Sequence, residues 1–347
     1  MHPRDKAALR LALGLGLTAF IAYGLALPLP YLACVMAVLV LCKPGPPLPL
    51  AKAAIVALVF AGLVAAGILM VPLLEHYAFT GVLLTAVLLF ALFYLGQLRK
   101  QALTTVLVLA FTLIPIAGVG EQGLVSLLSV ALAVGLFVGA VASAVSSALF
   151  PDPPRPVAEA GVATAPDREA ARWIALRGTL VVMPVFVLAL TNPSLYLAAI
   201  MKTVALGQQA SDIQARTAGR ELVGSTLLGA VLALAAWLGL SLWPSLWMLV
   251  LWLVALALWA GSALFGARGS RFGPSCWSNA LVTALILFGP AVEDSASGKS
   301  VLAGSAVRLG LFVAVAFYAW ATVWALERWR ARRPRKGEPM TVNAESG

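Results

Sequence analysis

Two cationic side chains lie inside long apolar runs of this sequence. Lys202 lies within LYLAAIMKTVALG, and Arg308 lies within AGSAVRLGLF. A charged group facing hydrocarbon costs at least ~2.5 kcal/mol, so each side chain is expected to face protein, a wet cavity or the membrane surface. We expect no acid inside any apolar run. The two cations therefore suggest a path for an anion.

Each cation also has a purely structural interpretation. Lys202 could form an internal ion pair, for which Asp212 and Glu221 are the nearest acids in sequence. Arg308 lies roughly 12 Å into its segment at 1.5 Å per residue and could instead extend to the membrane interface.

Other polar residues could line the same path. Thr203 and Gln208 follow Lys202, and Asn279 lies near the start of a later apolar segment. The alternative for each is a hydrogen bond to a neighbouring helix, as is common in membranes.

Two further arginines, Arg216 and Arg220, are four residues apart and so share one helical face. They form either a cytoplasmic mouth that collects anions or a basic anchor at the membrane surface.

The patterns of enzymes and metal sites are missing from the sequence. It contains no Walker A motif, and its two histidines, His2 and His76, lie outside the apolar segments. The three cysteines have no histidine nearby. We therefore expect no catalytic residue, metal or cofactor, and active transport would depend on an ion gradient or another subunit.

The composition is that of an all-α polytopic membrane protein. Of 347 residues, 61% are hydrophobic and 11% are charged, and the mean hydropathy is +0.96. The net charge of +10 is attributed to cytoplasmic loops and not to nucleic-acid binding.

Twelve apolar segments predict twelve transmembrane helices in two halves. The half at 1–150 has segments near 11–27, 30–42, 50–72, 78–97, 102–118 and 123–149. The half at 172–328 has segments near 173–191, 194–207, 219–241, 244–266, 277–291 and 300–326. Residues 151–171 predict a proline-rich cytoplasmic linker, and residues 329–347 predict a basic, disordered cytoplasmic tail.

The loop charges predict the orientation. With both termini in the cytoplasm, the lysines and arginines between the segments fall in the inner loops, and Lys299 alone falls in an outer loop. Glu293 and Asp294 are also expected in an outer loop. We therefore expect a bacterial inner-membrane protein with both termini in the cytoplasm.

The two halves resemble each other in sequence. YLACVMAVLVL at 31–41 aligns without a gap on YLAAIMKTVAL at 196–206, and GLFV occurs at both 135–138 and 310–313. An even number of helices per half predicts parallel repeats related by an axis along the membrane normal. Short segments at matching positions of two repeats indicate a transporter's binding site, and Lys202 lies in one of them.

The chain also resembles a known family. Two six-helix halves, a short second helix after a proline, and the pattern R-x-x-x-G-x-T-x-x-G at Arg220, Gly224, Thr226 and Gly229 are similar to the fusaric acid resistance superfamily. This group includes bacterial exporters of aromatic carboxylic acids. Many members carry a sizeable cytoplasmic domain between the halves, whereas this chain has only the linker at 151–171.

The resemblance implies an inner-membrane efflux component for organic acids, aromatic carboxylic acids in particular. It also implies a periplasmic adaptor of the membrane-fusion type and an outer-membrane channel as partners. A passive anion channel and a non-transporting scaffold of an envelope assembly are the alternatives. Membrane lipid is an expected contact, and the sequence leaves a homo-oligomer open.

Overall fold

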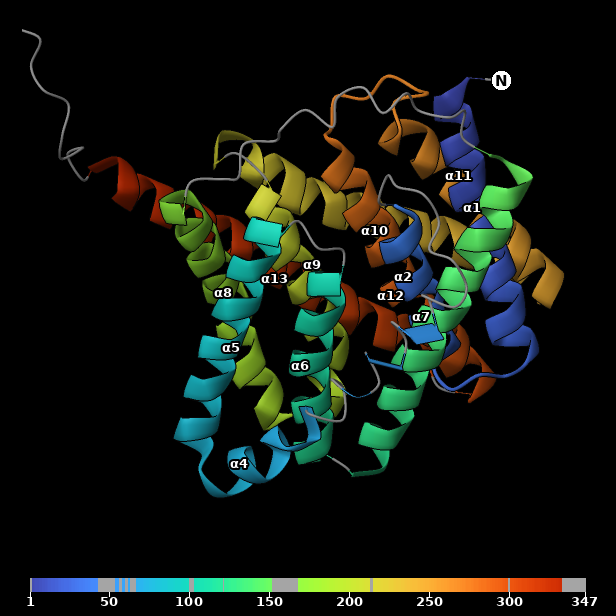
Figure 1. Cartoon of the computed structure of the whole chain (residues 1–347). Helices are drawn as coiled ribbons and strands as arrows, with labels where there is room; N and C mark the ends of the chain where they lie inside the picture. The colour runs from blue at the N-terminus through green and yellow to red at the C-terminus, as the bar shows by residue number, and fades with distance from the viewer. Residues whose placement is uncertain are drawn as a thin grey trace, which may run out of the picture.

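The computed structural model describes residues 2–42, 54–55, 58–59, 62, 67–99, 103–120, 122–151, 168–212, 215–298 and 300–332. Within these residues the chain forms twelve helices and no strand (Figure 1). Eight of the helices are long and apolar enough to cross a membrane. The protein is therefore an all-helical, multi-pass membrane protein.

The N-terminal half contains six of the described helices. They are α1 (Pro3–Gly24), α2 (Pro30–Leu41), α4 (Met70–His76), α5 (Ala78–Arg99), α6 (Leu103–Gly120) and α7 (Gln122–Leu149). Prolines in the first turns of α1 and α2 suit those positions, because the first turn of a helix needs no backbone donor. The predicted segment at 50–72 lies mostly outside the described residues.

The C-terminal half contains the other six. They are α8 (Arg168–Thr191), α9 (Pro193–Asp212), α10 (Ala215–Leu242), α11 (Leu246–Leu264), α12 (Pro274–Ala296) and α13 (Val301–Arg332).

Three predicted boundaries need correction. Helix α8 begins at Arg168, inside the predicted linker, and the acidic Glu169 suits its first turn. Helix α12 continues to Ala296, so Glu293 and Asp294 lie on a helix and not in a loop. Helix α13 continues to Arg332, so residues 329–332 are helical and not part of a disordered tail. Residues 333–347 lie outside the described part of the chain. Polar ends extend all three helices beyond their apolar runs.

Helix α12 is the central element of the fold. Every residue from Asn279 to Ala291 is buried, and α2, α9, α10, α11 and α13 all pack against this helix (Figure 1). A helix that is apolar on all sides is expected to be surrounded by protein. Its polar side chains are therefore held inside the bundle.

Helix α2, with 12 residues, and much of the short apolar stretch Leu195–Gly207 of the 20-residue α9 also lie inside the protein. All residues from Tyr31 to Val38 of α2 are buried, as are residues 199–204 of α9. Contacts with protein instead of lipid make the short length of α2 tolerable in a membrane. Helix α9 continues to Asp212, beyond the predicted segment at 194–207.

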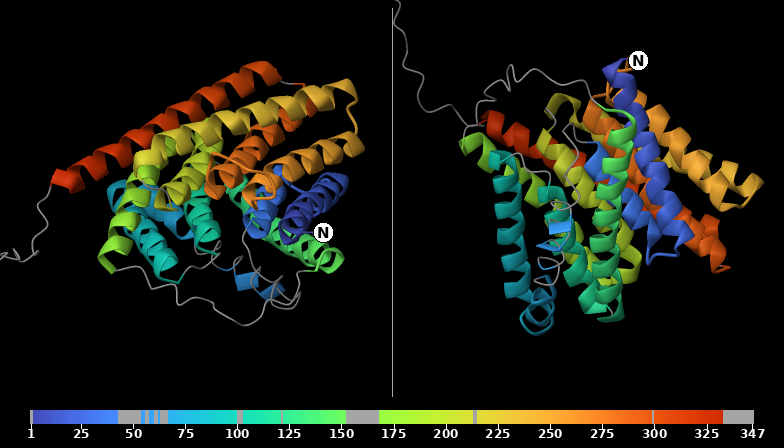
Figure 2. Two further views of the ribbon diagram at one scale, coloured as in Figure 1. Left: turned by 90° about the horizontal axis from the view of Figure 1, so that it is seen from above. Right: turned by 45° about the vertical axis from the view of Figure 1, so that its right-hand side comes forward.

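Helices of the N-terminal half pack against helices of the C-terminal half. Helix α1 packs on α11 and α5 packs on α8, while α6 contacts α9 and α12 contacts α2 (Figure 2). Within the halves, α2 packs on α7 and α9 on α13. Helices α2 and α9 therefore each contact both halves.

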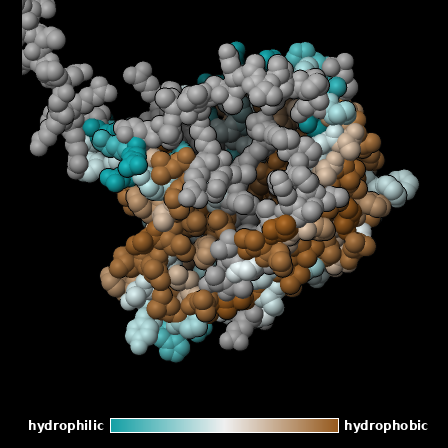
Figure 3. Space-filling model, in the orientation of Figure 1, coloured by the Kyte–Doolittle hydropathy of each residue, from teal (hydrophilic) through white to brown (hydrophobic). Residues whose placement is uncertain are grey.

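The outer surface is apolar over much of its height. Leu83 on α5, Leu251 on α11 and Phe317 on α13 are exposed, and Figure 3 shows apolar residues across the middle of one face with polar residues toward its ends. Such a surface is suited to hydrocarbon and not to water.

Candidate functional site

Lys202 on α9 is completely buried. Its exposed fraction is 0%, and its Nζ donates a hydrogen bond of 2.7 Å to Thr283 Oγ1 on α12. Thr283 Oγ1 in turn donates to the carbonyl oxygen of Asn279 at 2.6 Å. Among the described residues, no carboxylate forms an ion pair with Lys202. The ammonium is thus held by a neutral hydroxyl.

Polar residues connect α10 and α12 along the side of the bundle that leads to Lys202. Ser275 Oγ donates to Glu221 Oε2 at 3.3 Å, and Asn279 Nδ2 donates to Ser225 Oγ at 2.7 Å. Both pairs join residues 54 apart in sequence. Positions four apart lie on one face of a helix, so the two helices run parallel and in register. We call Glu221, Ser225, Ser275, Asn279 and Thr283 the polar ladder.

Gly229 brings the two helices close together at the end of the polar ladder. A Cβ atom at this position would lie 2.5 Å from Thr283 Cβ and 2.6 Å from the carbonyl oxygen of Ala280. Only glycine fits such a close approach without displacing its neighbours. Gly229 therefore places Thr283 where Lys202 can reach it.

Asn279 belongs to the polar ladder through its hydrogen bond to Ser225. Thr203 forms its hydrogen bond within its own helix instead. The Thr203 hydroxyl is buried and donates to the carbonyl oxygen of Ala199 on its own helix at 2.6 Å. Adjacent helical residues do not share a face, so Thr203 and Lys202 point in different directions.

The predicted cytoplasmic mouth is described only in part. The exposed Arg220 lies over the ring of Phe272, 5.0 Å from its centroid. Arg216 is on α10 and Gln208 is on α9, but their side chains lie outside the described part of the structure.

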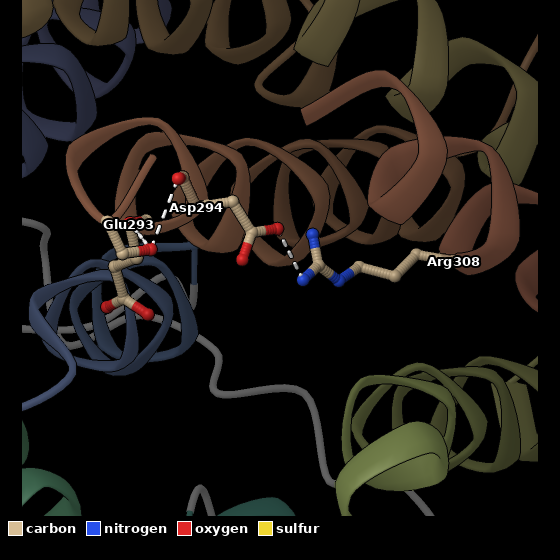
Figure 4. A network of polar contacts seen from close by, with 4 residues as sticks. Glu293, Asp294 and Arg308 are labelled. Carbon is tan, nitrogen blue, oxygen red and sulfur yellow. Dashed lines mark hydrogen bonds and ion pairs between the residues drawn. The ribbon is translucent and has the colours of Figure 1, made fainter. Parts of the chain in front are cut away.

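Arg308 does not share a site with Lys202. Its Nη2 donates to Asp294 Oδ2 at 2.7 Å, joining α13 to α12 (Figure 4). Asp294 lies beyond the predicted apolar segment at 277–291, on the additional residues by which α12 is longer than predicted. Thr283 and Asp294 are separated by roughly 16 Å along α12 at 1.5 Å per residue, which keeps the two cations apart.

Sequence reasoning missed Thr283, Ser225 and Asp294. Thr283 follows Asn279 by four residues, a spacing that could have revealed it. Asp294 was missed because the hydropathy of α12 falls before the helix ends.

Within the described residues, no group of three histidine, cysteine or acidic side chains could hold a metal ion. Cys34 on α2 and Cys276 on α12 are buried thiols.

A family model described as "Protein of unknown function (DUF2955)" matches residues 7–146. The matched region runs from α1 into α7 and does not contain Lys202 or Arg308. No curated protein matches the chain. No solved structure matches it either.

Proposed function

We propose that this protein is an inner-membrane transporter that exports a small organic anion, and that Lys202 binds the anion's carboxylate. The observation that carries the proposal is the complete burial of Lys202 against a hydroxyl. A buried charge without a counter-charge is strongly unfavourable, and a carboxylate ligand would supply that counter-charge.

The position of Lys202 supports the same function. It lies in the short apolar stretch Leu195–Gly207 of α9, inside the bundle and beside the central α12. Transporters commonly bind substrates near the middle of the membrane, on short or interrupted helices. The polar ladder would extend from this site toward the end of α10 that carries Arg220.

The substrate class and the partners are proposed from the resemblance to the fusaric acid resistance superfamily. We take aromatic carboxylic acids as the substrates, with a periplasmic adaptor and an outer-membrane channel completing the export route. Because the sequence has no ATPase motif, an ion gradient is the proposed energy source.

We also propose two parallel six-helix repeats, twelve spans and cytoplasmic termini. Reciprocal packing supports the repeats: the first helix of each half packs on the fourth proposed span of the other half, as α1 on α11 and α8 on α5. The family match at 7–146 coincides with most of the first proposed repeat. Reporter fusions that are active only in the periplasm should be silent at Arg99, and activity there would contradict this topology.

The main test replaces Lys202 by methionine, which keeps the length of the side chain and removes its charge. Export of benzoate from cells, measured at matched protein level, should fall at least about tenfold, the equivalent of ~1.4 kcal/mol of binding. Lys6→Met is the matched control, because Lys6 lies near the start of α1 and donates to the backbone oxygen of Pro151. Export unchanged by Lys202→Met would refute the binding role of Lys202, whereas flux that never saturates would indicate a channel. Export that is the same with and without the wild-type protein would favour a scaffold.

A further inference from the structure

The ion pair between Arg308 and Asp294 uses only part of the guanidinium. Nη2 donates to Asp294 at 2.7 Å, while Nη1 is buried and has no hydrogen-bond partner among the described residues. A carboxylate that binds arginine most strongly accepts from two parallel N–H groups. Asp294 accepts from one.

The pair lies beside Gly304 of α13 and is partly exposed. A Cβ atom at Gly304 would lie 3.1 Å from Asp294 Oδ2 and 3.6 Å from Arg308 Nη1, so the absence of a side chain there lets the pair pack closely against the backbone of α13. The side chains of Arg308 and Asp294 are 21% and 15% exposed. The Glu293 carboxylate lies on the far side of Asp294 from Arg308 (Figure 4).

We infer that Arg308 is a second carboxylate-binding site for the transported anion, and that Asp294 occupies it until the anion arrives. An incoming carboxylate could accept from both Nη1 and Nη2 and so displace a partner that accepts from one. This inference rests on the proposed function. It gives the anion a second binding site about 16 Å along α12 from Thr283.

Equilibrium binding of radiolabelled benzoate to the purified full chain in detergent tests the inference. All variants carry Lys202→Met, which removes the first site and separates this test from the export assay. Asp294→Asn should tighten benzoate binding at least about tenfold, because the internal competitor for a charge-assisted bond is removed. Adding Arg308→Gln to the Asp294→Asn variant should abolish benzoate binding. Adding Arg308→Lys should weaken it, because lysine lacks the planar guanidinium group.

Glu327→Gln is the matched control, because Glu327 also pairs with an arginine, the buried Arg177, at 3.1 Å. Equal tightening by Glu327→Gln would show a general charge effect and overturn the inference. Asp294→Asn could instead leave benzoate binding unchanged and lower the unfolding temperature. That result would show that the ion pair between Arg308 and Asp294 only joins α12 to α13, and it would overturn the inference as well. Displacement of benzoate by phosphatidylglycerol would assign Arg308 to a lipid headgroup, which also contradicts the inference.

Discussion

Lys202 and Arg308 occupy similar sequence contexts but different structural ones. Lys202 is fully buried and bonds a hydroxyl on α12, whereas Arg308 is partly exposed and bonds a carboxylate on the same helix. The more deeply buried cation is therefore the one without a described counter-charge. This difference supports the proposal that Lys202 receives an anionic ligand, while Arg308 already holds an internal one.

The largest expected effect comes from giving Lys202 the kind of partner that Arg308 has. Thr283→Asp would place a carboxylate beside the ammonium and compete with the substrate. Export of benzoate should fall about a hundredfold, the equivalent of ~2.7 kcal/mol. Thr283→Asn, which is similar in size and neutral, should retain most of the export. Equal losses in both variants would show that shape, and not charge, matters at position 283.

A smaller effect is expected from separating α10 and α12, since their close approach positions the neutral partner of Lys202. Gly229→Ala would bring a methyl group against the Ala280 carbonyl oxygen and Thr283, and overpacking of this kind typically costs about 1–3 kcal/mol. Thermal unfolding in detergent should show a lower midpoint. Gly310→Ala is the control, because nothing lies within 4 Å of a Cβ atom there. An unchanged midpoint for Gly229→Ala would contradict the close packing.

Much of the fold follows from hydropathy alone. The apolar run at 123–149 predicts α7 closely, since the helix spans Gln122–Leu149. Helix ends are harder to predict, because the polar turns of α12 and α13 carry no hydropathy signal. The charge of Lys202 and the short apolar run around it could be read directly from the sequence, but its hydrogen-bond partner could not.

The hydrogen-bond partners of Lys202 and Arg308 could not be predicted because each partner comes from a different helix than the cation. Thr283 is 81 residues from Lys202, and Asp294 is 14 residues from Arg308 across a helical hairpin. Which cation has a counter-charge depends on how α9, α12 and α13 pack. A single sequence contains no direct record of that packing.

The smallest expected effect concerns Arg220, which differs from Lys202 in being exposed. If Arg220 collects anions at a mouth, Arg220→Gln should raise the benzoate concentration for half-maximal transport less than about threefold in everted membrane vesicles. The effect should disappear at high salt, because salt screens exposed charges. Arg328→Gln is the matched control, since Arg328 is exposed and lies 5.3 Å from the ring centroid of Trp324. A shift that persists at high salt, or that Arg328→Gln reproduces, would assign Arg220 to the membrane anchor instead.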